Sequence, residues 1–161
     1  MEINKSLTIN WKLFENIKAL PKSIQDLFDQ AFSVQKKAYA PYSKFCVGAV
    51  VKTDANSVIT GSNQENKAYP SGLCAERVAL FYAGANYPDE KITDVVLVGD
   101  GEMLAEGAVF SPCGACRQVM VETQSKQKEP FKVWMLQADG RVFCIPNAMD
   151  LMPFSFGDEG V

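Results

Sequence analysis

Apolar side chains recur along the chain with two different spacings, which separate predicted helices from predicted strands. Between Pro21 and Ala38 they recur every three or four residues, which is typical of one face of a helix. A second helical stretch runs from Cys74 to Ala83, and Gly84 is expected to end it as a left-handed C-cap. A third is expected from an N-cap at Ser111 to about Thr123, so that Cys113 falls in its first turn.

Short runs rich in β-branched and aromatic residues lie between these helices, and each run predicts a strand. The runs are residues 45–52, 57–61, 92–99, 131–137 and 141–145. Residues 92–99 are apolar almost throughout, which indicates a strand buried on both faces. The order helix, strand, strand, helix, strand, helix, strand, strand predicts an α/β protein whose helices cover a mixed five-stranded sheet.

No internal repeat or linker divides the sequence, and 161 residues with 47% apolar side chains suit one domain. Residues 1–20 are patterned less regularly than the rest, so we expect an N-terminal extension there and one folded domain over 21–161. No apolar run approaches the about 18 residues that a membrane span requires, and the start lacks the apolar core of a signal peptide. We therefore expect a soluble, cytoplasmic protein that does not bind membranes.

Charge and histidine content exclude several functions. A formal net charge of −3 with three arginines gives no basic surface for a phosphate backbone, so we expect no nucleic-acid partner. The chain contains no histidine, which excludes Ser-His-Asp and Cys-His nucleophiles and histidine-based zinc sites. Any metal ligands must therefore be thiolates or carboxylates.

The five cysteines are the main candidates for chemistry. An odd number without a secretion signal indicates reduced thiols, used for metal binding, redox chemistry or burial. Cys46 and Cys144 lie within strand-like apolar runs, and we expect them to be small buried side chains. The other three lie in two short motifs at predicted helix starts, CAER at 74–77 and PCGACR at 112–117.

These two motifs predict a zinc site with an open position. Cys113 and Cys116 are three residues apart and face the same way on a helix, whose N-terminus favours the thiolate form. Cys74, brought in by the other helix start, makes three thiolates, and three protein ligands are typical of catalytic rather than structural zinc. The tilt of Cβ atoms toward a helix N-terminus lets Glu76 overlook the same helix end without binding the metal.

Arg77 and Arg117 each end one of the motifs. Zinc with three thiolates carries a formal charge of −1, which weakens its effect on bound water. Positive groups that donate hydrogen bonds to the sulfurs are therefore expected, and these arginines are the candidates. The alternative for both is a solvated surface side chain.

Two other interpretations of the cysteines remain open at this point. Cys113 and Cys116 could form a thioredoxin-like redox pair at a helix start, which leaves Cys74 and Glu76 without a role. A closed zinc module for binding partners would need four cysteine ligands, and Cys74 lacks the companion that a second Cys-x-x-Cys pair would supply.

The two motifs together resemble those of the zinc-dependent nucleoside deaminases. Further segments resemble the small cytidine deaminases in particular: AYAPYSKFCVGA at 38–49, SNQEN at 62–66 and LMPFSFG at 151–157. The resemblance covers most of the chain from about residue 24 to residue 157. It implies a three-layer α/β/α fold of the cytidine deaminase type.

The resemblance also implies how the residues divide the work. Cys74, Cys113 and Cys116 match the family's ligands for Zn²⁺, and Glu76 matches its proton-shuttling glutamate. The implied reaction is the hydrolytic deamination of cytidine or deoxycytidine to uridine or deoxyuridine, in pyrimidine salvage. Blasticidin-type deaminases share the zinc motif and are the nearer alternative. Polynucleotide-editing deaminases are a weaker alternative, because the acidic chain offers no basic groove.

Substrate contacts follow from the same resemblance. Asn63 and Glu65 match the polar pair that holds the ribose 3′-hydroxyl, and Phe45 matches the aromatic residue against the nucleoside. The backbone of Ala75 and of Ser111 matches the groups that address the pyrimidine O2 and the exocyclic amine.

The C-terminal segment carries an apolar cluster where the end of a monomer is usually polar, at residues 151–156. Composition alone leaves open a tail folded back over its own core. By resemblance, Phe156 matches an aromatic residue that reaches into a neighbouring subunit's site, which implies a homotetramer with shared active sites.

Overall fold

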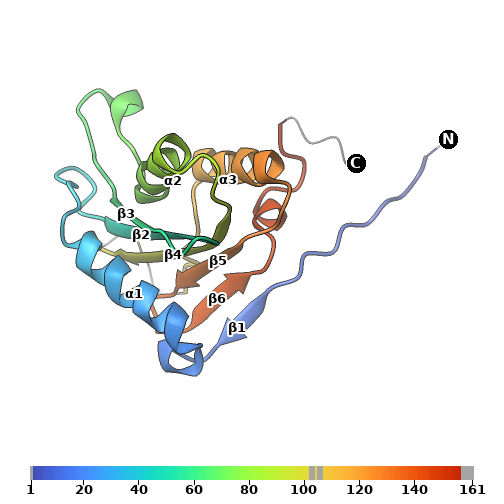
Figure 1. Cartoon of the computed structure of the whole chain (residues 1–161), viewed down its shortest axis with the longest axis horizontal. Coiled ribbons are helices and arrows are strands. Elements are labelled where there is room, and N and C mark those ends of the chain that lie inside the picture. Colours follow the sequence, from blue (N-terminus) through green and yellow to red (C-terminus); the bar gives the residue numbers. More distant parts are fainter. Residues whose placement is uncertain (1, 102–103, 105–106, 157–161) are drawn as a thin grey trace.

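A mixed sheet lies between one helix on its first face and two helices on its second (Figure 1). The computed structural model describes residues 2–101, 104 and 107–156, which contain six strands in the order β1-β6-β5-β4-β2-β3. The strands are β1 (Lys12–Phe14), β2 (Cys46–Thr53), β3 (Val58–Ser62), β4 (Ile92–Asp100), β5 (Lys132–Leu136) and β6 (Val142–Ile145). The helices are α1 (Lys22–Gln35), α2 (Ala75–Asn86) and α3 (Gly114–Gln127). Short 3-10 turns are η1 (Ile17–Ala19), η2 (Tyr69–Ser71) and η3 (Ala148–Leu151).

The predicted three-layer α/β/α arrangement with a mixed sheet is confirmed, but the number of strands is not. The described residues form six strands rather than five, because β1 pairs antiparallel with β6 at the sheet edge. Phe14 at the end of β1 packs its ring against that of Trp134 on β5, with centroids 5.8 Å apart. Part of the predicted N-terminal extension therefore belongs to the sheet.

The central strand β4 is buried on both faces, as its near-continuous apolar run predicts. Val96 and Val98 pack in the core beneath α1, whereas Val95 and Leu97 pack in the core beneath α2 and α3. β4 runs antiparallel to β2 and parallel to β5. A parallel pair needs a crossover connection, and the chain between β4 and β5 supplies it through α3.

Several predicted helix ends are wrong by about one turn, including the end of α3, which lies at Gln127 rather than near Thr123. α2 continues in helical backbone through Gly84 to Asn86, so this glycine is not a left-handed cap. α3 begins at Gly114 with Cys113 as its N-cap, whereas the sequence placed the N-cap at Ser111. The Ser111 hydroxyl is instead used to accept a hydrogen bond from Arg117, 2.8 Å away.

A close approach between β3 and α2 sets where α2 begins. Gly61 on β3 faces the first turn of α2 so closely that a Cβ atom there would lie 2.5 Å from the Ala75 carbonyl oxygen. Small side chains on the facing side of α2, Ala75, Ala79 and Ala83, are all buried against the sheet. The N-terminus of α2 therefore lies directly on the sheet.

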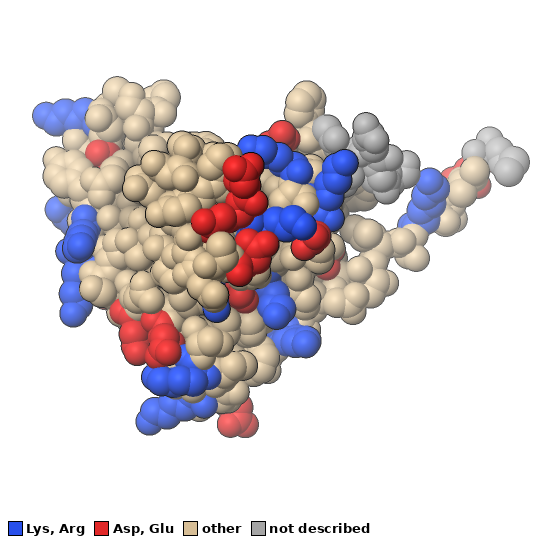
Figure 2. Space-filling model, viewed as in Figure 1, with Lys and Arg blue, Asp and Glu red and all other residues tan. Residues whose placement is uncertain are grey.

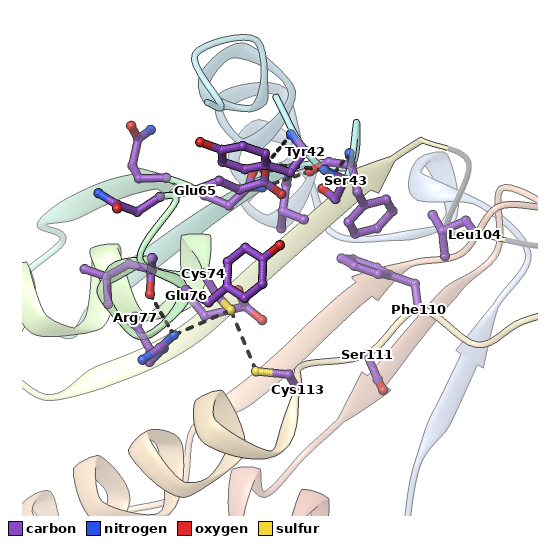
Figure 3. A pocket seen from close by; sticks show the side chains of 18 of the residues that line it. Tyr42, Ser43, Glu65, Cys74, Glu76, Arg77, Leu104, Phe110, Ser111 and Cys113 are labelled. Atoms are coloured by element: carbon purple, nitrogen blue, oxygen red, sulfur yellow. Dashed lines mark hydrogen bonds between the residues drawn. The ribbon is translucent and has the colours of Figure 1, made fainter. Parts of the chain in front are cut away.

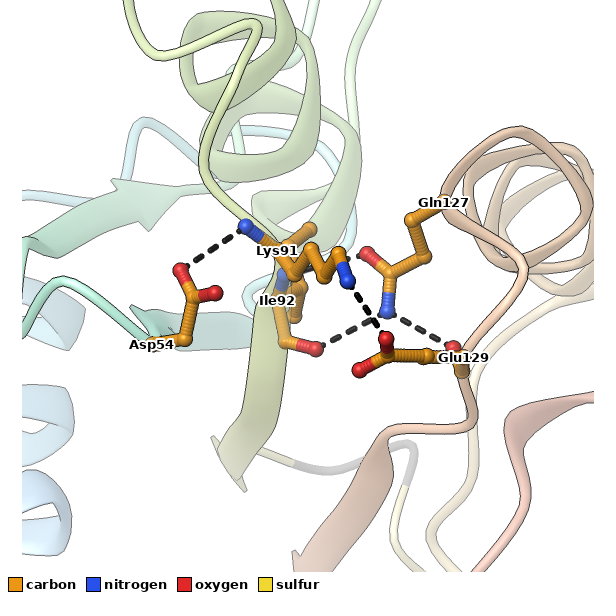
Figure 4. A network of polar contacts seen from close by, with 5 residues as sticks. All are labelled: Asp54, Lys91, Ile92, Gln127 and Glu129. Atoms are coloured by element: carbon orange, nitrogen blue, oxygen red, sulfur yellow. Dashed lines mark hydrogen bonds and ion pairs between the residues drawn. The ribbon is translucent and has the colours of Figure 1, made fainter.

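The end of α3 and the start of β4 are joined by polar contacts (Figure 4). The Gln127 side chain accepts a hydrogen bond from the Ile92 N–H and donates one to the Ile92 carbonyl, both 3.0 Å long. Lys91 forms an ion pair with Glu129, and its N–H donates to Asp54 at 3.0 Å. These contacts fix the position of the C-terminal end of α3 relative to the start of β4.

In the described part of the chain, we find no helix with both the length and the apolar content that a membrane crossing requires.

Replacing Gly61 with Ala is expected to destabilise the protein by about 1–3 kcal/mol, because the added methyl group meets backbone atoms of α2 that cannot move freely. Gly84→Ala is the matched control. No atom lies within 4 Å of a Cβ there, so this change should stabilise the helix by about 0.5–1 kcal/mol. Urea unfolding of both variants measures the difference, and equal stabilities would contradict the close approach.

Candidate active site

Two helix N-termini meet on the second face of the sheet and bring three thiols together. Cys74 is the N-cap of α2, Cys113 is the N-cap of α3, and Cys116 lies in the first turn of α3. Their Sγ atoms all lie within 4.8 Å of one another. The Cys74–Cys113 separation is 3.7 Å and the Cys113–Cys116 separation is 3.5 Å. The structure thus unites the cysteines of the two sequence motifs.

Both N-cap residues have extended backbone, and neither side chain caps its own helix with a hydrogen bond. Free backbone N–H groups and the helix dipoles therefore surround the sulfurs with positive potential, which favours thiolates. The hydrogen bond from the Cys116 thiol, helped by Arg77 and Cys113, lowers the pKa of Cys74 to about 5. The same hydrogen bond, together with burial, raises the pKa of Cys116.

The sulfur positions fit one zinc ion. Zn–S bonds of about 2.3 Å in tetrahedral geometry place ligand sulfurs about 3.8 Å apart. The separations of 3.7 and 3.5 Å come close to that spacing before any adjustment. Among the described residues this is the one group of three or more potential ligands. With three protein ligands, a tetrahedral ion keeps one position for a non-protein ligand.

Glu76 is a carboxyl group buried beside the thiols, with 5% of its surface exposed. Burial, followed by the negative charge of Cys74, raises the pKa of Glu76 to about 7. A carboxyl group with a pKa near neutrality can both accept and release a proton at physiological pH. The combination of burial and a nearby charge is typical of catalytic acids and bases.

The two arginines differ in what they contact. Arg77 places Nη2 3.9 Å from Cys74 Sγ and 3.4 Å from the Gly72 carbonyl oxygen, and its buried Nε has no hydrogen-bond partner within the described chain. Within the described chain the Arg117 guanidinium donates its hydrogen bonds to oxygen atoms and none to a sulfur, so it is not the sulfur donor that it was a candidate for. It is not a solvated side chain either, since it donates to the Pro112 carbonyl at 2.8 Å and to the Leu151 carbonyl at 3.1 Å.

A cavity of about 780 Å³ opens above the thiols (Figure 3). Its lining includes most of the predicted site residues: Phe45, Asn63, Glu65, Cys74, Glu76, Arg77, Ser111 and Cys113. Ala75 and Cys116 are fully buried behind the cavity wall. Figure 3 shows Tyr42 and Glu65 on the side of the cavity that is away from Cys113. A cavity of this size holds a small organic molecule.

The side chains of Asn63 and Glu65 form hydrogen bonds with the backbone of residues 42–47, which form one wall of the cavity. The Asn63 side chain accepts from the Val47 N–H and donates to the Phe45 carbonyl, both at 2.8 Å. Glu65 Oε2 accepts from the backbone N–H groups of Tyr42 at 2.8 Å and Ser43 at 3.3 Å. The Ser43 hydroxyl and these N–H groups lower the pKa of Glu65, so it faces the cavity as a carboxylate.

Phe110 is a wall residue that the sequence analysis missed. Its ring meets that of Phe45 edge to face, with centroids 6.0 Å apart, so the two aromatic rings line the cavity together. Gln137 holds the Phe110 backbone in place by accepting from its N–H at 2.9 Å and donating to its carbonyl at 3.1 Å. Phe110 stands two residues before the second motif and directly before Ser111, and this position was the available signal.

The C-terminal segment is held by its backbone, while its last aromatic side chain remains outside the chain's own cavity. Gln118 on α3 donates to the Phe156 carbonyl at 3.1 Å and accepts from the Phe156 N–H at 3.3 Å. Leu151 is buried, but Phe154 and Phe156 are exposed, the latter by 89%. A tail folded back over its own core therefore does not describe the aromatic part of this segment.

The two cysteines outside the cluster differ in environment. Cys144 is buried in the core beneath α1, and burial raises its pKa to about 11, as expected for an inert thiol. Cys46, at the start of β2, is half-buried rather than buried. All five thiols are free, and Cys74 completes a three-thiol cluster that neither a redox pair nor a four-cysteine module accounts for.

Comparisons with known proteins point to one family. The family model of the cytidine and deoxycytidylate deaminase zinc-binding region matches residues 21–129. A cytidine deaminase from Halalkalibacterium halodurans is 41% identical over 98 residues, which are 61% of this chain and 70% of that protein. One from Mycoplasma genitalium is 30% identical over 136 residues, 84% of this chain and 91% of that protein. The crystal structure of cytidine deaminase from Burkholderia pseudomallei superposes with a TM-score of 0.65 at 38% identity, covering 81% of this chain and 97% of that one.

We expect purified protein to contain one zinc ion per chain, because three convergent thiols form one site. Cys113→Ala should lose the metal and much of the stability of the two helix starts, since metal binding and folding are coupled. Cys46→Ala, which removes a thiol outside the cluster, is the control and should keep the full metal content. Elemental analysis of the three proteins decides this, and zinc-free active protein would contradict the site.

Proposed function

The chain belongs to the zinc-dependent cytidine and deoxycytidylate deaminases, and on this basis we propose which residues carry out its reaction. The enzyme hydrolyses cytidine or deoxycytidine to uridine or deoxyuridine and ammonia, with pyrimidine salvage as the expected context. The observation that carries the proposal is Glu76, a buried carboxyl group beside three clustered thiols in the wall of a cavity large enough for a nucleoside.

Cys74, Cys113 and Cys116 hold the zinc ion. When bound, zinc supplies Lewis acidity that allows water to act as a nucleophile at neutral pH. Arg77 stands 3.9 Å from the Cys74 sulfur and offsets part of the negative charge that three thiolates create. Helix N-termini behind two of the three sulfurs add to this compensation.

Glu76 moves the protons. It takes one proton from the attacking water and delivers it to N3 of the base as the water oxygen bonds to C4. It then takes the second proton from that oxygen and delivers it to the amine as the C4–N bond breaks, so that water and the nucleoside become the keto product and ammonia. The raised pKa of Glu76, about 7, supports this role because the group changes protonation state readily near neutral pH. Its burial keeps bulk water from competing for the proton.

The cavity walls hold the nucleoside. Asn63 and Glu65 bind the ribose 3′-hydroxyl, and Phe45, joined by Phe110, packs against the nucleoside. The backbone N–H of Ala75, at the free end of α2, donates to the pyrimidine O2. The Ser111 backbone addresses the exocyclic amine. The support for these assignments is that Phe45, Asn63, Glu65 and Ser111 line one cavity and that Ala75 is the first residue of α2.

The functional unit is a homotetramer in which Phe156 completes the site of a neighbouring subunit. Two features support this: the aromatic side chain lies outside its own cavity, and Gln118 holds its backbone in a defined position. Phe81 and Tyr82 on the outer face of α2 are also exposed and available for subunit contacts. Closed symmetry is the common outcome for such assemblies.

Two further proposals concern organisation and location. The catalytic domain spans residues 21–161, which the beginning of the family match at residue 21 supports, and residues 1–20 precede it as an extension that adds β1 to the edge of its sheet. The enzyme works in the cytoplasm, which five free thiols support, because reducing conditions keep them available for metal.

Glu76→Gln should retain zinc and the fold while kcat falls by about 10²- to 10⁴-fold, because glutamine keeps the hydrogen bonds but cannot transfer the proton. Glu122→Gln makes the same chemical change at an exposed position on α3 and should leave kcat unchanged. Spectrophotometric assays with cytidine, paired with zinc analysis, give the result. Near-normal turnover of the first variant would exclude the assigned role.

Sharing of sites between subunits predicts complementation. Phe156→Ala and Glu76→Gln subunits, each impaired alone, should regain activity when co-expressed, since some sites then combine an intact Glu76 with a neighbour's intact Phe156. Activity per chain is compared with that of each variant expressed alone. A fully active protein of monomeric mass in light scattering would refute the shared site.

A further inference from the structure

The N-terminal segment forms an extended arm that projects beyond the body of the molecule (Figures 1 and 2). Residues 2–11 run without helix or strand of their own into β1, and residues 2–13 are all exposed. Figure 2 shows that the charged side chains of the arm lie toward its free end and that most of the arm between them and the body carries none. The arm lies outside the segment that the family model matches.

The arm has the pattern of a strand with one apolar face. Leu7, Ile9, Trp11 and Leu13 alternate with polar residues, and in extended backbone alternate residues share a face. These four side chains are exposed by 64%, 42%, 53% and 43%. A tail that remains in solvent usually has few apolar residues, so this pattern indicates a partner.

The body already sets the direction of the arm and the side to which its apolar face turns. Lys12, Leu13 and Phe14 pair with Cys144, Phe143 and Val142 of β6. The ring of Trp11 packs on that of Phe143 with centroids 5.0 Å apart. Phe143 contacts the core beneath α2 and α3, so the apolar residues of the arm continue that side of the sheet.

No strand of the described chain pairs with the arm or with the outer edge of β1. β1 is the end strand of the sheet, and its last pair with β6 joins Lys12 to Cys144. The twelve residues from 2 to 13 span about 40 Å when extended, far more than the three-residue β1. An edge of this length with an apolar face is a template for pairing with another chain.

We propose that the arm and β1 form an antiparallel pair with the same segment of a second copy of this chain, across a twofold axis. Antiparallel pairing places odd positions opposite odd positions and therefore joins the two apolar faces. With Leu7 opposite Leu7, Ile3 lies opposite Trp11 and Glu2 lies opposite Lys12. The pairing joins the two sheets edge to edge.

Charge selects this arrangement over the parallel one. Parallel pairing in register places Glu2, Lys5 and Lys12 each against its own copy, and like charges directly opposite one another are destabilising. The antiparallel register removes these contacts, gives one Glu–Lys pair at each end, and sets Lys5 opposite Ile9. A self-complementary surface of this kind also closes after two copies.

The arm pairing and the proposed exchange of Phe156 involve different parts of the chain. None of the arm residues lines the cavity, so arm variants should keep zinc and intrinsic turnover. This separates a failure of the arm pairing from a failure of the catalytic assignments.

Sedimentation velocity on the zinc-loaded enzyme tests the pairing. Ile9→Lys puts a charge in the apolar face and opposite Lys5 of the second copy, and should halve the mass of the assembly or weaken it at least tenfold. Asn10→Lys adds the same charge to the polar face and should leave the mass unchanged. Equal masses for both variants and the unaltered chain, or an unaltered chain that is monomeric, would overturn the proposal.

Thiol cross-linking tests the register without weakening the contact. Leu7→Cys faces its own copy and should form a covalent dimer on mild oxidation of the zinc-loaded enzyme, in which the three clustered thiols are occupied. Asn4→Cys is separated from its own copy by six positions, about 20 Å, and should not. Cross-linking of both variants, or of neither, would contradict the antiparallel register, and an assembly whose mass grows without limit would contradict the closed pair.

Discussion

Two helix N-termini meet on one face of the sheet, and each carries partial positive charge, so the site is stable only with negative charge between them. Of the two N-cap thiols, Cys74 supplies that charge, because its pKa is lowered to about 5. Cys74 and Cys113 both lie between the two helix ends. As N-caps they make no capping hydrogen bond, which forgoes about 0.5–2 kcal/mol at each helix. The positive potential that destabilises two facing helix N-termini stabilises thiolates, and it also stabilises their complex with zinc, which has a formal charge of −1. Metal affinity and the packing of α2 against α3 are therefore two aspects of one interaction.

The chemistry of Glu76 follows from the same packing. Small residues on α2 let the helix lie directly on the sheet, and Gly61 leaves the space for its first turn. Glu76, the residue after Ala75, is therefore buried by the position of the helix itself. Its raised pKa is a consequence of how α2 lies on the sheet. Gln127, far from the cavity, helps in a different way, because it holds α3, which carries Cys116, against β4.

Periodicity was enough to predict the helices, the hairpins and the buried central strand, because each buries a face whose spacing is visible in the sequence. β1 was missed because three residues form it and its partner β6 lies about 130 positions away, beyond any local pattern. The start of α3 was misplaced because the Ser111 hydroxyl serves Arg117 rather than the helix. Motif spacing grouped the three cysteines correctly, whereas the wall residue Phe110 required knowledge of how two distant segments face each other.

Arg117 links the chain that leads into the metal site to the start of the C-terminal segment. One guanidinium group binds the Ser111 hydroxyl and the Pro112 carbonyl, which lead into the metal site, and also the Leu151 carbonyl, where the C-terminal segment begins. The next residue, Gln118, holds Phe156. In evolutionary terms, substitutions at Ser111 and Pro112, next to the metal site, and substitutions in the C-terminal segment from Leu151 onward cannot accumulate independently. A lineage that altered the C-terminal segment would also have to preserve or rebuild the contacts of this one side chain.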